Sequence, residues 1–286
     1  QYDHVKQGKR QVGSTFKPFV YATAIMNLGM TPCSTVSNAT YTKGDWVVEG
    51  NGGNLTLRDA LAHSKNPVAV RLIESVSPKK VIQLARDLGV TEEMPNEYAI
   101  ALGSSDITIY EMLGAYSSFA NFGNYIKPEM VWRIEDANGR VIKEVKNETK
   151  EVMNEMYAYT MIDLMKGVTR FGTASGELRR MGIPETVEIA GKTGTTQNNS
   201  DGWFMGITPN LATGVWVGWE DRATHFYSTG EGQGAKMALP IWGIFMKKVW
   251  ADKELGITPD DKFAKPSNWT GDCADLQGLG GYGDDG

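Results

Sequence analysis

A serine and a lysine stand three residues apart near the start of the chain, in Ser14-Thr15-Phe16-Lys17. Apolar residues recur at helical spacing after them, which predicts a helix over 15–28 whose first turn carries both side chains on one face. A serine hydroxyl is a weak nucleophile without a neighbouring base, and a lysine kept neutral by burial can be that base. The structural alternative is a helix-capping serine followed by a solvent-exposed lysine.

Ser64 and Asn66 form a second pair, directly before Pro67, between two predicted short helices over 57–63 and 67–75. At such a junction the two side chains can present a hydroxyl and an amide to one cleft. The structural alternative is complete in itself, because asparagine caps helices well and proline suits the first helical turn.

The third motif, Lys192-Thr193-Gly194-Thr195, lies in a predicted strand over 187–196. Glycine weakens a strand, and a common reason for its presence is another backbone that approaches closely. A substrate peptide that pairs with the edge of a sheet would be such a backbone. A bulge or a strand end is the structural alternative. Strand alternation points Lys192 and Thr193 to opposite faces.

The elements that position these motifs are mainly helices first and strands later, which predicts an α+β fold. Asn138-Gly139 marks a hairpin over 130–142, and short polar turns join the later strands into an antiparallel meander. The expected helices are 15–28, 57–63, 67–75, 78–88, 107–121, 153–166 and 235–250, and the expected strands are 187–196, 203–207 and 213–219.

The composition is that of a soluble globular protein, with 41% hydrophobic and 22% charged residues among 286. The net charge is −5, but the segment 271–286 holds four aspartates and no other charge, which leaves −1 for the rest. A nearly neutral body disfavours nucleic-acid binding, which needs cations to neutralise phosphates. The histidines and cysteines lack metal-ligand spacing, so we expect no metal and no cofactor.

The three motifs follow the order S-x-x-K, S-x-N and K-T-G, with 50 residues from Ser14 to Ser64 and 128 from Ser64 to Lys192. This order resembles that of the penicillin-binding proteins. The flanking residues resemble the class A, or bifunctional, members over about 8–250. The matching blocks are RQVGSTFKPF at 10–19, ALGSS at 101–105, EM at 111–112, AY at 115–116, FAN at 119–121, GKTGTT at 191–196, DGWF at 201–204 and GVWVG at 214–218.

The resemblance implies a D,D-transpeptidase that cross-links peptidoglycan stem peptides through a serine acyl-enzyme. It implies that Ser14 attacks the D-Ala-D-Ala carbonyl and that Lys17 is its base. Ser64 would pass the proton to the leaving nitrogen, with Lys192 tuning it electrostatically. Asn66 would bind an amide of the substrate.

The resemblance also assigns the substrate contacts. Thr193 and Thr195 would bind the terminal carboxylate, with Gly194 beside the substrate strand. The backbone N–H groups of Ser14 and Thr195 would form the oxyanion hole. β-Lactams would acylate the same serine and inhibit the enzyme.

The lysines of the three motifs should lie close together. We expect Lys17, Lys65 and Lys192 to share one pocket, because each motif contributes one of them. Neighbouring cations lower one another's proton affinity, which would help one lysine to act as a neutral base.

The implied fold is that of the penicillin-binding transpeptidases and serine β-lactamases, a central antiparallel sheet covered by helices plus a mainly helical subdomain. We expect a transpeptidase domain over 1–258, without the first strands that the family carries before this block. A Gly- and Asp-rich tail is expected over 259–286. Full-length members carry a glycosyltransferase domain and a membrane anchor upstream.

The substrate implies the compartment, because peptidoglycan lies outside the cytoplasmic membrane. The partners would be a donor and an amine-bearing acceptor stem peptide, with no nucleic acid, on the periplasmic or extracytoplasmic face. That oxidising setting permits a bond between Cys33 and Cys273 without requiring one.

Two other functions share the three motifs. A serine β-lactamase must also activate water, often with a glutamate after S-x-N. Glu93, Asn96 and Glu97 fall in that stretch, but nothing around them matches the loop of that family. A non-catalytic β-lactam sensor is the other alternative. Persistence of a penicillin label separates the enzymes, since a β-lactamase releases it rapidly.

Overall fold

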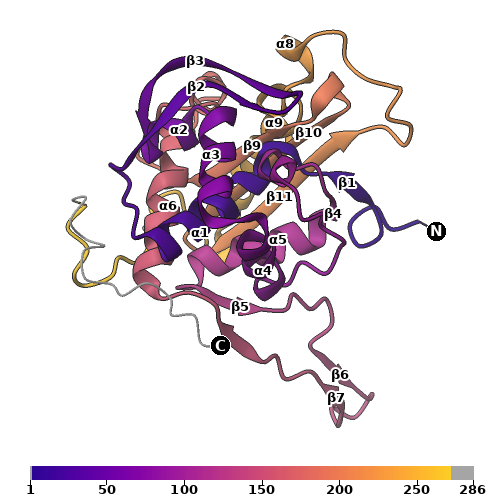
Figure 1. Cartoon of the computed structure of the whole chain (residues 1–286). Coiled ribbons are helices and arrows are strands. Elements are labelled where there is room, and N and C mark those ends of the chain that lie inside the picture. Colours follow the sequence, from indigo (N-terminus) through magenta and orange to yellow (C-terminus); the bar gives the residue numbers. More distant parts are fainter. Residues whose placement is uncertain (1, 272–286) are drawn as a thin grey trace.

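A three-stranded antiparallel sheet forms the centre of the computed structural model, which describes residues 2–271 apart from the side chain of Gln197. The long helix α9 (Gly234–Ala251) packs on one face of this sheet. Helix α5 (Ile109–Ala120) and the turn η1 (Gly13–Phe16) pack on the other face (Figure 1). The predicted α+β class, with a central sheet covered by helices, is confirmed.

The helical part of the molecule precedes the sheet in the chain and lies beside it (Figure 1). It contains α1 (Lys17–Leu28), α2 (Leu57–Ala62), α3 (Asn66–Val76), α4 (Pro78–Asp87), η2 (Tyr98–Leu102) and α6 (Glu155–Arg170), and α7 (Ser175–Arg180) follows α6. The remaining short helices are η3 (Gln197–Asn199), α8 (Thr229–Gly232) and η4 (Lys253–Leu255).

The sheet has the order β11-β10-β9, with strands β9 (Ala190–Thr195), β10 (Asp201–Thr208) and β11 (Leu211–Gly218). Short turns join consecutive strands, so the predicted meander is confirmed. Lys192 pairs with Met205, Thr193 with Phe204 and Gly194 with Trp203. Phe204 meets Trp242 of α9, whereas Trp203 binds the carbonyl of Gln11 just before η1, so the residues of β9 paired with them also face opposite sides.

Helix starts follow local side-chain chemistry. Thr56, Thr108 and Asn154 each accept a hydrogen bond from the backbone N–H three residues on, at the starts of α2, α5 and α6. The cap on Thr108 explains why α5 begins at Ile109, after strand β4 (Asp106–Thr108), and not at the predicted position 107. Apolar faces of α1, α3 and α6 then join one continuous core.

Within residues 2–271, four two-stranded pairs lie outside the central sheet. The hairpin expected over 130–142 is present as β6 (Arg133–Glu135) and β7 (Val141–Glu144). The pairs absent from the sequence prediction are β2 (Thr35–Lys43) with β3 (Trp46–Thr56), β1 (Lys9–Gln11) with β4, and β5 (Asn124–Ile126) with β8 (Thr149–Glu151). The β2–β3 ribbon buries few side chains, so its sequence has no apolar alternation to read.

The described part of the expected tail packs against the domain. The Phe263 side chain is buried, and its backbone N–H donates to Glu188 at 2.9 Å. The ring of Trp269 lies 4.9 Å from that of Tyr159 on α6. Phe263 and Trp269 therefore pack this segment against the domain. The domain boundary at 258 stays a prediction, and Cys273 lies outside the described residues.

Backbone contacts leave no room for side chains around the turn that carries Ser14. Gly13 donates its N–H to the carbonyl of Gly103 at 3.1 Å. A Cβ atom on Gly103 would lie 1.9 Å from the Gly13 oxygen, and one on Gly13 would lie 2.7 Å from the Thr195 oxygen. Both residues have positive φ, +53° at Gly13 and +74° at Gly103, which glycine adopts at no steric cost. The turn is therefore fitted between the 98–103 segment and β9.

We predict that Gly103→Ala destabilises the protein far more than Gly44→Ala. Both positions have positive φ, but a Cβ atom on Gly44 would meet nothing within 4 Å. Gly44→Ala should lower the free energy of unfolding by about 1–2 kcal/mol, the ordinary cost of a left-handed residue. Gly103→Ala should cost at least about twice as much, because the backbone must also move. Urea unfolding curves measure both, and equal losses would contradict the packing argument.

Candidate active site

The turn bearing Ser14 is held to the sheet by a buried carboxylate. Asp201 at the start of β10 is fully buried and accepts hydrogen bonds from Arg10 Nε at 2.8 Å and Trp216 Nε1 at 2.9 Å. The hydroxyl of Ser200 donates to it at 2.8 Å. These partners favour the charged carboxylate and hold the pKa of Asp201 below its usual value, against the opposing effect of burial.

Two further anchors fix the same turn from the side. Trp203 Nε1 donates to the carbonyl of Gln11 at 2.9 Å. The hydroxyl of Tyr116, on α5, donates to the carbonyl of Thr15 at 2.6 Å. Ser14 itself is half-buried, in the 3-10 turn that runs directly into α1. The sequence blocks contain these anchoring residues, but no local pattern revealed what they bind.

Lys17 is completely buried and reaches the Ser64 segment. Its Nζ donates to the Ser64 carbonyl at 2.5 Å, to Ser64 Oγ at 3.1 Å and to Asn66 Oδ1 at 2.6 Å. Desolvation lowers the pKa of Lys17 well below its ordinary value, and the charges of Lys192 and Lys65 lower it further. The predicted cluster of three lysines is therefore present around this amine.

Lys192 approaches the same hydroxyl from the sheet. This second lysine is also completely buried, and its Nζ donates to Ser64 Oγ at 2.8 Å and to the Thr193 carbonyl at 3.1 Å. Burial lowers the pKa of Lys192 to about 7. Ser64 Oγ thus joins two amines that are 175 positions apart in the sequence.

The α2–α3 junction presents Ser64 and Asn66 toward these lysines. Ser64 has φ of +55°, an uncommon conformation for a residue other than glycine and one that costs on the order of 1–3 kcal/mol. Asn66 is the first residue of α3, and its side chain makes no capping bond. The capping interpretation of Asn66 is therefore wrong, because its amide oxygen binds Lys17 instead.

Strand β9 carries the third motif, with its side chains divided between two faces. Gly194 faces η1, where an added Cβ would lie 2.8 Å from Thr15 Cγ2 and 3.0 Å from the carbonyl of Val12. The close approach inferred at Gly194 thus comes from the protein's own turn. Thr195 Oγ1 accepts a hydrogen bond from the N–H of Gly234 at 3.1 Å.

Thr173 is a residue that sequence reasoning missed. Its hydroxyl lies 2.7 Å from that of Thr193, and its N–H donates to the carbonyl of Ala62 at 3.0 Å. Thr173 therefore touches both β9 and the helix that leads to Ser64. A lone threonine in a loop has no sequence signal that could have marked it.

The glutamates considered for water activation take no part in this network. Among the side chains of residues 2–271, those of Glu93, Asn96 and Glu97 make no hydrogen bond to the motif residues. In the same range no cluster of histidine, cysteine and acidic side chains could hold a metal ion. None of the helices in that range is long and apolar enough to cross a membrane.

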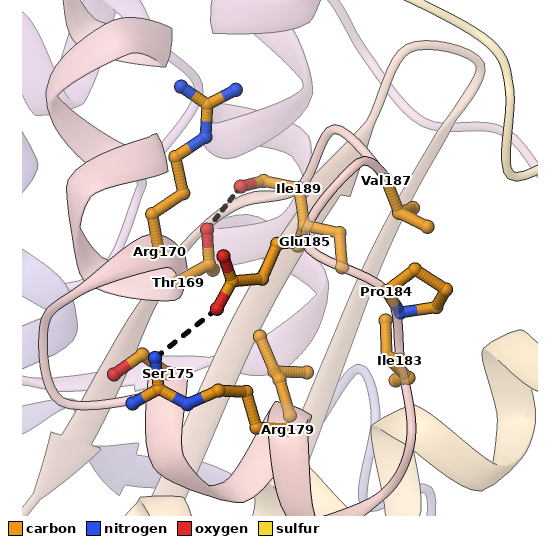
Figure 2. Close-up of a pocket in the computed structure, with 10 residues that line it drawn as sticks. Thr169, Arg170, Ser175, Arg179, Ile183, Pro184, Glu185, Val187 and Ile189 are labelled. Carbon is orange, nitrogen blue, oxygen red and sulfur yellow. Dashed lines mark hydrogen bonds and ion pairs between the residues drawn. The ribbon is translucent and has the colours of Figure 1, made fainter.

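A small pocket between α6, α7 and the segment leading to β9 is separate from these motifs (Figure 2). Arg179 forms an ion pair with Glu185 beside it, and Thr169 Oγ1 donates to the Ile189 carbonyl at 2.5 Å. The pocket has a volume of about 20 Å³, which can hold one or two water molecules but is too small for a peptide. The Thr169 bond joins α6 to the residue directly before β9.

Comparison with known proteins identifies the family to which this chain belongs. The family model for the penicillin binding protein transpeptidase domain matches residues 3–225. Penicillin-binding protein 1A of Aquifex aeolicus is 35% identical over 275 residues, which cover 91% of this chain and 36% of the relative. Penicillin-binding protein 1A of Neisseria meningitidis is 34% identical and covers 88% of this chain and 33% of the relative. The chain thus spans about a third of the curated relatives that it matches.

Solved structures share the fold. Penicillin-binding protein 1A from Haemophilus influenzae superposes with a TM-score of 0.81 at 25% identity, covering 93% of this chain and 45% of that one. PonA1 from Mycobacterium tuberculosis, in complex with penicillin V, gives a TM-score of 0.78 at 24% identity and covers 93% of this chain and 74% of that one. The chain therefore belongs to the transpeptidase-domain family of the penicillin-binding proteins, with class A proteins as its relatives, as its motif blocks predict.

Proposed function

We propose that this domain is a serine D,D-transpeptidase of peptidoglycan. The observation that carries the proposal is the hydroxyl of Ser64 held between the buried amines of Lys17 and Lys192. Such an arrangement can move a proton between a nucleophile and a leaving group without water. The structural alternative, a helix-capping Ser14 with a solvent-exposed Lys17, does not account for a completely buried Lys17.

The acylation step uses Lys17 as the base. Lys17 follows Ser14 by one helical turn, and its lowered pKa provides a neutral amine that can accept the Ser14 proton. As Ser14 Oγ bonds to the D-Ala carbonyl carbon, the negative charge that develops on oxygen is bound by the N–H groups of Ser14 and Thr195. The charged Lys17 that results is stabilised by its three oxygen acceptors.

Collapse of the tetrahedral intermediate requires a proton on the leaving nitrogen. Ser64 donates its hydroxyl proton to that nitrogen and takes one back from Lys17, while Lys192 holds the Ser64 oxygen. The C–N bond breaks and D-Ala leaves. The amine of a second stem peptide then attacks the acyl-enzyme, with the same groups transferring its proton in reverse, and a cross-link forms.

The proposal also assigns substrate contacts, inhibitors and location. Asn66 binds an amide of the donor, and Thr193 and Thr195 bind its carboxylate, with Gly194 completing the strand beside it. β-Lactams acylate Ser14 because they present a reactive amide and a carboxylate to the same groups. The donor and acceptor stems place the domain on the extracytoplasmic face, with a glycosyltransferase domain and a membrane anchor in the full-length protein.

We predict that Ser14→Ala abolishes covalent labelling by fluorescent penicillin and release of D-Ala from a stem peptide. Ser104→Ala is the matched control, since Ser104 is an exposed serine near the same turn, and it should label normally. Gel fluorescence and D-Ala release measure the two activities. Labelling of the Ser14 variant would show that the nucleophile is another residue.

The lifetime of the penicillin label and the release of D-Ala together distinguish a transpeptidase from the two alternative functions. A transpeptidase keeps the penicillin label and releases D-Ala from a stem peptide. Rapid loss of the label would indicate a serine β-lactamase. A persistent label without any D-Ala release, even with an acceptor amine present, would indicate a β-lactam sensor.

The acylation rate should rise with pH as a buried lysine loses its proton, because only the neutral amine can accept the Ser14 proton. Lys65→Gln removes a cation that lowers the pKa of Lys17, so the ascending limb of the acylation rate should move to higher pH. Lys79→Gln, which removes an exposed lysine of α4, should leave the limb in place. Penicillin acylation rates between pH 5 and 9 measure the shift, and an unmoved limb would contradict the cationic cluster.

A further inference from the structure

The loop between α6 and α7 connects two of the three motifs. Gly172 packs so closely on the end of α2 that an added Cβ would lie 2.2 Å from the carbonyl of Ala62. The same carbonyl accepts the N–H of Thr173 at 3.0 Å. The backbone of Thr173 is therefore bound to Ala62, two residues before Ser64, and the Thr173 side chain can contact β9.

The hydroxyl of Thr173 meets that of Thr193 at 2.7 Å. Each hydroxyl has one proton and can accept as well as donate, so one of the two donates and the other keeps its proton for another acceptor. Thr193 is buried, whereas Thr173 is exposed to solvent. A bond from Thr173 to Thr193 leaves the Thr193 proton available to an incoming anion.

Thr195, two residues along the same face of β9, shows the same arrangement with a fixed direction. Its Oγ1 accepts from the backbone N–H of Gly234, which can only donate, so the Thr195 proton must point elsewhere. The hydroxyls of Thr193 and Thr195 thus each form a hydrogen bond with a neighbouring group of the protein. Chains of hydrogen bonds of this kind strengthen the terminal donor, because each bond polarises the next.

We propose that Thr173 is a positioning residue of the carboxylate site, which orients the Thr193 hydroxyl as a donor to the terminal carboxylate of the donor peptide. The inference rests on the proposed function and deepens it. Thr173 itself touches neither the carboxylate nor the reacting carbonyl. Its contribution is the direction of one proton, so its loss should matter only for ligands that carry the negative charge.

The test compares a ligand that has the carboxylate with one that lacks it. Benzylpenicillin and its methyl ester share the reactive amide, and the ester has no anionic group for Thr193 to bind. In Thr173→Val, which keeps the branched shape and removes the hydroxyl, acylation by benzylpenicillin should slow about five- to tenfold. Acylation by the ester should change less than about twofold, and Thr173→Ser should restore the wild-type ratio of the two rates.

Matched variants and outcomes separate the explanations. Thr186→Val alters an exposed threonine in the segment before β9 and should leave both rates unchanged. Equal slowing of both ligands in Thr173→Val, or no restoration by serine, would overturn the positioning role while the proposed function stands. A wild-type protein that neither ligand acylates would overturn the proposed function and this inference together. Urea midpoints close to that of the wild type establish that the variants are folded.

Discussion

Burial of two lysine amines around one serine hydroxyl is the constraint on which the rest of this structure depends. Desolvation makes a buried ammonium costly, and the fold offsets that cost in two ways. It surrounds Lys17 with three oxygen acceptors, and it lowers the pKa of Lys192 to about 7, so that this amine can shed its charge. Among residues 2–271, no carboxylate acts against the lowered pKa of either lysine, whereas an acid beside them would raise both pKa values and keep the amines charged. The chemistry thus requires a pocket that is cationic, dry and rigid at once.

Rigidity comes from contacts that stand outside the three motifs. Asp201 binds Arg10 ahead of Ser14, Trp203 and Tyr116 bind carbonyls on either side of Ser14, and Gly103 is fitted against Gly13. These contacts join the serine turn and the residues just before it to β10, α5 and the 98–103 segment, so the turn cannot shift without disturbing all three. The proposed proton transfer needs its partners held within about 0.5 Å, and these contacts hold the serine turn in place. The strained φ of Ser64 is tolerated for the same reason, since both lysines hold the hydroxyl in place.

The sequence predicted the parts of this site that have local signatures. The S-x-x-K, S-x-N and K-T-G motifs, the helices that carry them and the alternation of Lys192 and Thr193 all depend on spacing along the chain, and the structure bears out the helices, the meander and the alternation. Asn66 was open to a capping interpretation because the sequence does not say which partner a side chain will meet. The β2–β3 ribbon was not predicted, because both of its faces are largely exposed and its sequence lacks apolar alternation. The contact of Thr173 with Thr193 could not be predicted, because a hydrogen bond between two hydroxyls gives neither sequence segment a recognisable pattern.

The charge of the pocket gives the substrate an active part in the proposed reaction. Before a donor binds, burial and the charges of Lys192 and Lys65 lower the pKa of Lys17, which keeps a neutral amine ready to deprotonate Ser14 in the proposed step. A donor carboxylate held by Thr193 and Thr195 brings a negative charge to the strand that carries Lys192, and this charge raises the proton affinity of the amines. The free enzyme therefore favours the form that accepts a proton, and the bound complex stabilises the protonated form that the reaction creates. A neutral ligand gains neither the contact nor this shift, so carboxylate recognition and base catalysis are two consequences of one electrostatic design.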